Sequence, residues 1–247
     1  MLLAVDAGNT NIKLGVFRGD ELLGHWRLPT DATRAAELFE RANLSAEEVK
    51  GIAIASVVPS LNASLKSTSE ELFGLTPLFV DHMTETGLKI LYNPPSALGA
   101  DRIVDAVAAV AKYGTPCIVV NFGTATTFNA INGAREFIGG AISPGLMTCS
   151  EALFARAAKL PRVEFARPEK VIGSSTVEAM QSGIYHGYVG LVDGMLGKML
   201  EAIGGKPRIV ATGGLAPLIA PASQYIDHVD ETLTLDGLRL VYNSCKS

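Results

Sequence analysis

One pattern occurs twice in this chain, and it restricts the possible folds more than any other feature. In each copy an apolar run leads into a short polar turn, and an alternating apolar run follows. The two turns are Asp6–Asn11 and Asn121–Thr127. Each copy predicts a strand, a tight turn and a second strand. Two copies about 115 residues apart indicate a duplicated fold, with one such turn in each half.

The chemistry of the first turn has two interpretations. Its glycine allows backbone N–H groups to approach an anion closely, and its Asn and Thr side chains add neutral donors. The carboxylate of Asp6 can hold Mg²⁺ directly or through water. These are the parts of a phosphate and metal site. The same residue types also form ordinary hairpin turns for conformational reasons alone.

Composition sets limits on the class of protein. A chain of 247 residues can be one large domain or two, and its 48% hydrophobic residues indicate a well-buried core. The net charge of −4 argues against nucleic-acid binding. No apolar run approaches a membrane span, and no basic segment precedes the apolar residues 1–5, so we expect neither membrane insertion nor a signal peptide. The expected location is the cytoplasm.

Cysteine and histidine spacing does not indicate a metal or redox site. The three cysteines form no CxxC motif, and the four histidines are scattered. Cys117 lies in an apolar run and is expected to be a small core residue.

The first half is expected to fold as a mixed sheet with helices on its faces. Strands are predicted at 1–6, 12–18, 21–28, 52–55 and 77–80, and helices at 31–42, 61–73 and 101–112. A loop is expected at 87–98. The break at Gly114–Pro116 marks the predicted boundary between a domain of residues 1–114 and one of residues 115–247.

The second half repeats this order. Strands are predicted at 117–121, 126–132, 135–142 and 208–211, and helices at 145–158, 174–202, after the turn 212–215, and at 232–242. Residues 159–172 are expected to be irregular, and Asn132–Gly133 to form a hairpin turn. Five glycines at positions 183–197 lower the stability of a helix. They therefore indicate close packing against the other domain or a second subunit.

Asp101 and Arg102 stand near the start of a predicted helix, where backbone N–H groups attract anions. Asp101 can accept a proton from a substrate hydroxyl, and the Arg102 guanidinium suits a carboxylate or phosphate. Asp101 can equally be a helix cap. Gly213–Gly214 allows a nucleotide base to approach the backbone, or is a tight corner. Thr176 either caps a helix or presents its hydroxyl to a substrate.

Six motifs together resemble the type III pantothenate kinase family, which includes proteins known as Bvg accessory factors. They occur in order along nearly the whole chain: Asp6–Asn11, Ser56–Pro59, Gly99–Arg102, Gly123–Thr127, Gly139–Gly145 and Thr212–Leu215. The resemblance implies the α/β fold of the actin, Hsp70 and sugar-kinase superfamily. It also implies two ribonuclease-H-like domains, each with a mixed five-stranded sheet flanked by helices, and a homodimer.

The resemblance implies ATP-dependent phosphorylation of pantothenate, the first committed step towards coenzyme A. Asp101 would be the base. Mg²⁺ and ATP phosphates would be held by Asp6, Gly8, Asn9, Thr10, Asn11 and Lys13. Gly123, Thr124 and Ala125 would form a second phosphate turn, with Gly213 and Gly214 at the nucleotide. Pantothenate would contact Tyr92, Gly99, Arg102 and Thr176. A monovalent cation, K⁺ or NH₄⁺, would assist.

The chain departs from the family pattern at two positions. Asn121 and Asn129 stand where the family commonly has aspartates, so a cation held there, monovalent or Mg²⁺, would lose direct electrostatic stabilisation. Two alternatives to an active pantothenate kinase therefore stay open. One is a catalytically impaired relative that acts as a ligand-binding or regulatory accessory protein. The other is a kinase of the same superfamily with a different acceptor.

Overall fold

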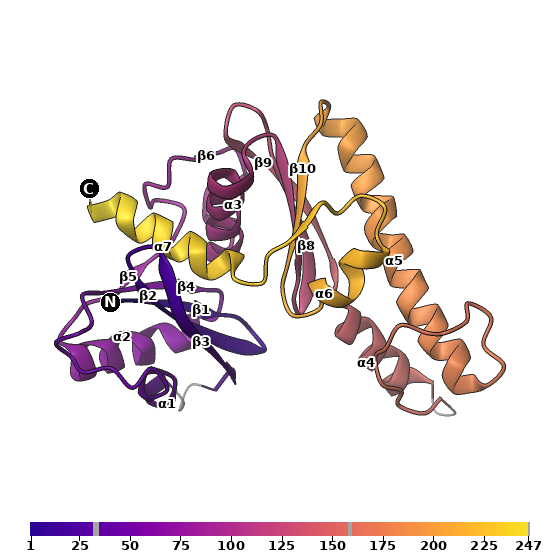
Figure 1. Ribbon diagram of the computed structural model, residues 1–247, viewed down its shortest axis with the longest axis horizontal. Helices are drawn as coiled ribbons and strands as arrows, with labels where there is room; N and C mark the ends of the chain where they lie inside the picture. Colours follow the sequence, from indigo (N-terminus) through magenta and orange to yellow (C-terminus); the bar gives the residue numbers. More distant parts are fainter. Residues whose placement is uncertain (32–34, 158–159, 247) are drawn as a thin grey trace. The chain divides into compact units, whose positions relative to one another are not determined.

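A computed structural model describes residues 1–31, 35–157 and 160–246. It divides into two compact units (Figure 1). Unit 1 comprises Met1–Lys112, Arg135–Phe137 and the chain from Thr232, and unit 2 comprises Tyr113–Ala134 and Ile138–Glu231. The predicted domains, 1–114 and 115–247, differ from these units mainly in the placement of the C-terminal segment.

The sheet of unit 1 has five strands in the order β3-β2-β1-β4-β5. The strands are β1 (Leu2–Ala7), β2 (Asn11–Arg18), β3 (Glu21–Pro29), β4 (Gly51–Ser56) and β5 (Leu78–Phe79). β1 to β3 are antiparallel, whereas β4 pairs in parallel with both β1 and β5. The mixed five-stranded sheet expected for the first half is therefore confirmed.

Helices flank this sheet. They are α1 (Ala35–Glu40), α2 (Pro59–Phe73), α3 (Ala100–Tyr113) and α7 (Leu233–Lys246), with a 3₁₀ turn, η2 (Pro95–Ala97). α2 begins with a proline, which suits the first helical turn, and ends at Gly74 in the left-handed conformation. α1 and α2 contribute Leu38, Phe39, Leu61 and Leu65 to the buried core. The expected start of the first helix includes residues 32–34, which lie outside the described part.

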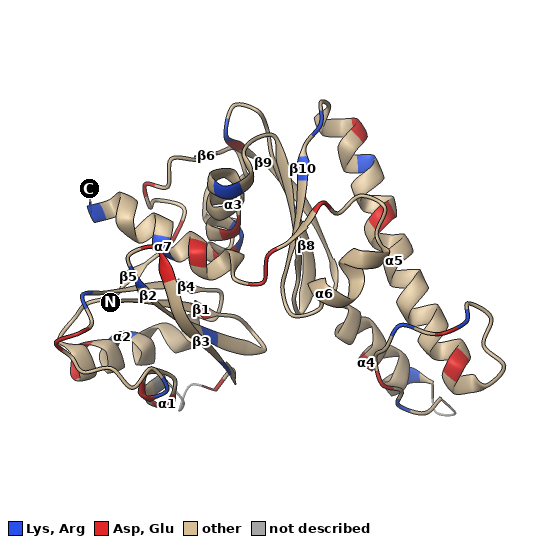
Figure 2. Ribbon diagram, in the orientation of Figure 1, with Lys and Arg blue, Asp and Glu red and all other residues tan. Residues whose placement is uncertain are grey.

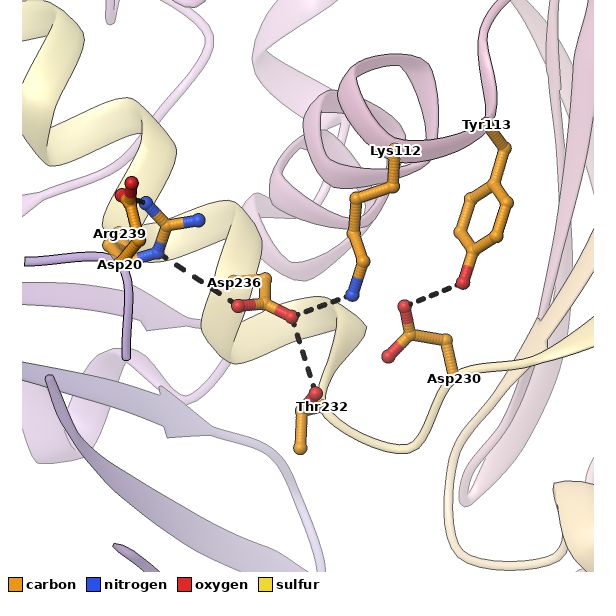
Figure 3. Close-up of polar contacts among 7 residues, drawn as sticks. All are labelled: Asp20, Lys112, Tyr113, Asp230, Thr232, Asp236 and Arg239. Carbon is orange, nitrogen blue, oxygen red and sulfur yellow. Dashed lines mark hydrogen bonds and ion pairs between the residues drawn. The ribbon is translucent and has the colours of Figure 1, made fainter. Parts of the chain in front are cut away.

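α7 belongs to unit 1 although it is the last helix of the chain. A β-carbon built on Gly237 would lie 2.1 Å from the carbonyl oxygen of Val104, so α7 and α3 pack backbone to backbone. Asp236 of α7 is contacted by Lys112 Nζ at 2.9 Å and by Thr232 Oγ1 at 3.2 Å (Figure 3). Its neighbour Arg239 forms an ion pair with Asp20. These contacts explain why the C-terminal segment is part of unit 1.

The sheet of unit 2 has the order β11-β10-β7-β8-β9. Its strands are β7 (Cys117–Phe122), β8 (Ala125–Ile131), β9 (Glu136–Pro144), β10 (Arg208–Thr212) and β11 (His228–Val229). Its helices are α4 (Leu146–Arg156), α5 (Thr176–Ile203) and α6 (Ala216–Ile219), with a 3₁₀ turn, η3 (Ala220–Ala222). Core residues from the strands pack against α5 through Tyr185, Tyr188, Val192 and Leu196.

The second sheet differs from the expected five strands by a sixth, β6 (Lys89–Ile90), at its edge. β6 lies in the segment that we expected to be a loop, and it pairs in parallel with Glu136 and Phe137 of unit 1. A two-residue strand is too short to carry an alternating pattern, which is why the sequence did not reveal it. β11 was missed for the same reason.

The predicted hairpin turn at Asn132–Gly133 lies between β8 and β9. The turn between β8 and β9 spans residues 132–135, and its left-handed residue is Arg135, with φ 59°, instead of Gly133. The predicted end of the 145–158 helix, and the start of the irregular 159–172 segment, lie partly outside the described residues. Cys117 is fully buried as expected, and burial raises the pKa of its thiol to about 12. Within the described ranges, no helix is sufficiently long and apolar to cross a membrane.

Candidate active site

The first polar turn connects β1 and β2 in unit 1. Gly8 N–H donates to the Asn11 carbonyl at 3.0 Å, which closes the turn. Asp6 is the last but one residue of β1, lies opposite Lys13 in the register, and is 8% exposed. The Nζ of Lys13 lies 3.2 Å from Asp6 Oδ2. Asn9 and Thr10 at the tip are exposed, so the turn places exposed polar residues next to one carboxylate.

The start of α3 lies close to the ends of β1 and β4. Val57 N–H donates to the Ala7 carbonyl at 3.1 Å, and a β-carbon on Gly99 would lie 3.4 Å from a methyl of Val57. The same β-carbon would lie 2.6 Å from Oδ1 of Asp101. A side chain at position 99 would therefore have to displace this carboxylate. The Ser56–Pro59 motif thus forms part of the wall around Asp101.

The pKa of Asp101 is raised above its ordinary value. Burial is the largest cause, and the negative charge of Asp6 is the second. A hydrogen bond from the Arg102 N–H to Asp101 Oδ1, 2.8 Å long, and the Arg102 charge oppose the shift. A carboxylate with a raised pKa is a stronger base, because it holds a proton more tightly. The Asp101 carboxylate is therefore a stronger proton acceptor than an ordinary aspartate.

Arg102 is almost buried, with 5% exposure, and lies against two aromatic rings. Its guanidinium carbon is 5.2 Å from the ring centre of Tyr92 and 5.5 Å from that of Phe137. The two rings meet edge to face, with centres 6.2 Å apart. Sequence reasoning identified Tyr92 but missed Phe137. The pairing of β6 with β9 places Phe137 beside Arg102, and the sequence carries no pattern that reveals this pairing.

The second polar turn, in unit 2, is also closed by a hydrogen bond from its glycine N–H, but to the carbonyl two residues further along instead of three. Gly123 N–H donates to the Ala125 carbonyl at 3.1 Å. The carbonyl of Thr124 accepts from Gly145 N–H at 3.0 Å and from Thr148 Oγ1 at 2.8 Å. A β-carbon on Gly145 would lie 2.4 Å from the carbonyl oxygens of Gly123 and Thr124. Gly145, which belongs to the Gly139–Gly145 motif but was not predicted as a site residue, is therefore required for this turn.

Asn121 and Gly213 meet at the carboxyl ends of β7 and β10. Thr212 lies opposite Asn121 in the parallel register. Gly213 has φ +93°, and a β-carbon there would lie 2.6 Å from the Phe122 carbonyl oxygen and 2.8 Å from Asn121 Oδ1. The next residue, Gly214, is exposed. The second turn, the Asn121 amide and the Gly213 backbone thus form one group within unit 2.

Asn129 lies on β8 opposite Val119 and is fully buried. Its side-chain amide donates to Thr127 Oγ1 at 3.4 Å, and Thr127 lies opposite Asn121. Because residues two apart on a strand share a face, both asparagines lie on the same face of the sheet. A neutral amide occupies this buried position at lower desolvation cost than a carboxylate.

Thr176 does not cap α5. The N-cap is Ser175, whose hydroxyl accepts from the Glu178 N–H at 3.3 Å. Glu178 in turn accepts from the backbone and hydroxyl of Ser174, and these hydrogen bonds lower the pKa of Glu178. The capping interpretation of Thr176 is therefore wrong, because Ser175 already fills that role. Thr176 is exposed, so its hydroxyl is accessible.

The residues at the first turn fit a divalent cation such as Mg²⁺ bound largely through water. Among the described residues, no group of three His, Cys, Asp or Glu side chains could enclose a metal ion. Asp6 and Asp101 are close enough for the charge of Asp6 to raise the pKa of Asp101. A cation between phosphate oxygens and Asp6 would offset this repulsion. Mg²⁺ commonly keeps several waters and uses one or two carboxylates, which matches this set.

Comparison with known proteins identifies the family. The model of a family described as type III pantothenate kinase matches residues 2–198. The type III pantothenate kinase of Koribacter versatilis (strain Ellin345) is 48% identical over 265 residues, covering 100% of this chain and 97% of the relative.

Solved structures agree in fold. A protein from Campylobacter jejuni, titled a conserved putative Baf family transcriptional activator, has a TM-score of 0.61 at 18% identity, covering 99% of this chain and 98% of that chain. A ROK family glucokinase from Streptomyces griseus has a TM-score of 0.55 at 13% identity, covering 98% and 99%. The chain therefore shares its fold with these two proteins, one of them a sugar kinase, which agrees with the fold that the motifs implied. Since the family model and the full-length relative agree, the chain belongs to the type III pantothenate kinase family.

Proposed function

We propose that this chain transfers the γ-phosphoryl group of ATP to the hydroxyl of pantothenate, which yields 4′-phosphopantothenate in the first step of coenzyme A biosynthesis. Membership of the family over nearly the whole chain supports the activity. The observation that carries the proposal is Asp101, a carboxylate of raised pKa at the start of α3 beside Asp6 and Arg102.

Asp101 acts as the general base. It accepts the proton of the pantothenate hydroxyl while that oxygen forms a bond to the γ-phosphorus, and the bond between this phosphorus and the bridging oxygen of ADP breaks. The raised pKa of Asp101 strengthens it as a proton acceptor. Gly99 keeps the space beside the carboxylate open, because any larger residue would displace it.

The acceptor is recognised by Arg102, Tyr92, Gly99 and Thr176. A buried guanidinium is suited to a carboxylate, since it remains charged and offers paired donors. Pantothenate carries a carboxylate at the end opposite its reacting hydroxyl. This complementarity of charge favours pantothenate over the neutral acceptors of other kinases in the superfamily.

The phosphates of ATP are held by the polar turns. In unit 1 these residues are Asp6, Gly8, Asn9, Thr10, Asn11 and Lys13, and in unit 2 they are Gly123, Thr124, Ala125, Gly213 and Gly214. Mg²⁺, when bound at Asp6, supplies positive charge to the phosphate oxygens. Lys13 already lies 3.2 Å from Asp6, so it can move between the carboxylate and a phosphate.

A monovalent cation, K⁺ or NH₄⁺, is the least supported part of this assignment, because Asn121 and Asn129 offer neutral amide oxygens. These two residues favour a second candidate function, an impaired relative that binds the ligands without turning them over. Asp6, Asp101 and Arg102 support the active enzyme instead, since the base and the proposed metal ligand are both present.

We also infer a homodimer built on α5. A β-carbon at Gly183, Gly187, Gly190 or Gly194 would meet no atom within 4 Å. Figure 2 shows this helix largely without charged residues, and none occurs between Glu178 and Asp193. An apolar groove of about 490 Å³ runs beside it, lined by residues that include Leu146, Leu153, Met180, Ile184 and Leu191. An open glycine row on an apolar helix suits close approach of a second copy. The cytoplasm, where ATP is available, is the compartment that the proposal requires.

The test is a coupled assay of the purified chain with ATP, Mg²⁺ and pantothenate, with and without K⁺ or NH₄⁺. Production of ADP that requires pantothenate, and that falls by about 10²-fold or more in Asp101→Asn, is expected. Wild-type turnover in that variant would refute the base assignment. Binding of pantothenate without any turnover would support the impaired relative instead.

A further inference from the structure

We propose that Phe137 is a positioning residue for the acceptor: with Tyr92 it holds the Arg102 guanidinium so that the enzyme prefers acceptors that carry a carboxylate. This inference rests on the proposed function, in which Arg102 binds the carboxylate of pantothenate. It adds to that function a residue from β9 that no sequence motif contains.

The geometry brings two rings to one guanidinium. The ring centres of Tyr92 and Phe137 lie 5.2 and 5.5 Å from its central carbon, within the range of cation–π attraction. Phe137 is fully buried, and Arg102 is 5% exposed. The attraction is stronger in such a desolvated place than at the surface.

The ring contacts are made through π faces and so do not neutralise the charge of the guanidinium as a carboxylate would. The two rings restrict the orientation of the side chain, and the guanidinium keeps its positive charge, which attracts an anionic ligand. Restricting Arg102 before binding reduces the entropy lost when an acceptor carboxylate binds. A neutral acceptor gains little from this arrangement.

The backbone of β6 and β9 holds the two rings. Ile90 lies opposite Phe137 in the parallel register, and Leu91 N–H donates to the Phe137 carbonyl at 2.9 Å. Tyr92 follows immediately. Lys89 and Glu136 form an ion pair of 2.7 Å at the same register. The short strand β6 therefore sets the position of the ring pair relative to the start of α3.

The experiment measures the affinity of the full chain for pantothenate and for pantothenol, in which a neutral alcohol replaces the carboxylate. Both are titrated calorimetrically against the wild type, Phe137→Leu and Phe17→Leu. Phe17 is the matched control: it is also fully buried in unit 1 and also lies against an arginine, Arg239, at 5.7 Å.

Phe137→Leu is expected to weaken pantothenate binding about tenfold and pantothenol binding less than about twofold. Phe17→Leu should change neither. Equal weakening of both ligands, or no change in either, would overturn the inference. A second readout is the double variant with Arg102→Ala, in which Phe137→Leu should have no further effect on pantothenate. If Phe137→Leu does not fold, Phe137→Met takes its place, because its unbranched, flexible side chain adapts better to an irregular gap in the core.

Failure of this inference is distinguishable from failure of the proposed function. If the wild type does not phosphorylate pantothenate, the proposed function is refuted. If it does so, and Phe137→Leu binds pantothenate as tightly as Phe17→Leu, only the role of Phe137 is refuted.

Discussion

Gly99 and Asp101 are so close that a β-carbon on the glycine would lie 2.6 Å from the carboxylate oxygen. Gly99→Ala should therefore displace Asp101 from its hydrogen bond with the Arg102 N–H. We expect kcat to fall about tenfold or more, since small displacements of a catalytic group have large effects. Steady-state kinetics with pantothenate checks this.

The matched control is Gly133→Ala. Gly133 has no positive φ, and a β-carbon there would meet nothing within 4 Å, so this variant should retain wild-type kcat. Equal kcat in Gly99→Ala and Gly133→Ala would contradict the role given to Gly99.

Replacing the base should stabilise the protein while it removes activity. The folded-state pKa of Asp101 is raised above the ordinary value of an unfolded aspartate, so its contribution to stability is present at low pH and is lost as the pH rises through the folded-state pKa. Asp101→Asn removes this loss of stability at higher pH, because the amide of asparagine does not ionise. We expect the variant to unfold at a higher temperature than the wild type at pH 7, and the two to converge below pH 4. If the difference in unfolding temperature between the variant and the wild type stayed the same from pH 7 to below pH 4, the raised pKa of Asp101 would be contradicted.

The raised pKa of Asp101 also determines how activity depends on pH. Asp101 must be deprotonated to act, so kcat/KM should fall as the pH drops through its raised pKa. A profile of kcat/KM against pH should therefore show an acidic limb at higher pH than an ordinary aspartate would give. If the acidic limb lay at the pH expected for an ordinary aspartate, burial and the charge of Asp6 would not raise the pKa of Asp101 as stated.

Gly213→Ala should damage unit 2 more than a glycine change that has only a conformational cost. Gly204 is the control, because its φ is +68° and nothing lies within 4 Å of a β-carbon there. Gly204→Ala is expected to cost about 1–3 kcal/mol of unfolding free energy, because its φ of 68° and ψ of 174° lie in a region that is essentially restricted to glycine. At Gly213 the clash with the Phe122 backbone adds to this, so the loss should be larger. Denaturant unfolding of both variants measures the difference, and equal losses would show that the close contact does not matter.

The two asparagines should respond differently to a carboxylate. Asn129→Asp places a charge in a fully buried position and should cost several kcal/mol, on the order of 3, at pH 7. Asn121 is only half-buried, so Asn121→Asp should cost less. If a monovalent cation binds there, K⁺ should restore stability to either variant more than it affects the wild type. Thermal unfolding with and without K⁺ is the measurement.

The glycine row of α5 gives a test of assembly. Gly187→Glu places a charge in the open apolar row and should dissociate the inferred dimer, as judged by sedimentation velocity. Gly133→Glu, in an exposed turn, introduces the same charge elsewhere and should not. An identical sedimentation coefficient for Gly187→Glu and the wild type would contradict the inferred interface.

Sequence patterns predicted the elements that have strong local signals. The two turns at Gly8 and Gly123, and the mixed sheet around β1, follow from apolar periodicity and turn residues. Motif order predicted the group of Asp6, Gly99 and Asp101. β6 and Phe137 could not be predicted, because a two-residue strand has no periodicity and its partner lies about 47 residues away. Nor could the return of α7 to unit 1, since packing partners such as Gly237 and Val104 are set by tertiary contact.

That return has a consequence for how the protein is made. A ribosome releases residues 1–112 long before α7, yet Gly237 and Tyr242 of α7 pack against Val104 and Gly51 within unit 1. The apolar surface of unit 1 that α7 will cover therefore stays exposed while all of unit 2 is synthesised. Unit 2 has its own sheet and core to fold during that interval. Unit 1 thus completes its packing only after unit 2 has been synthesised, and chains truncated before Thr232 lack the helix that completes the unit that carries Asp101.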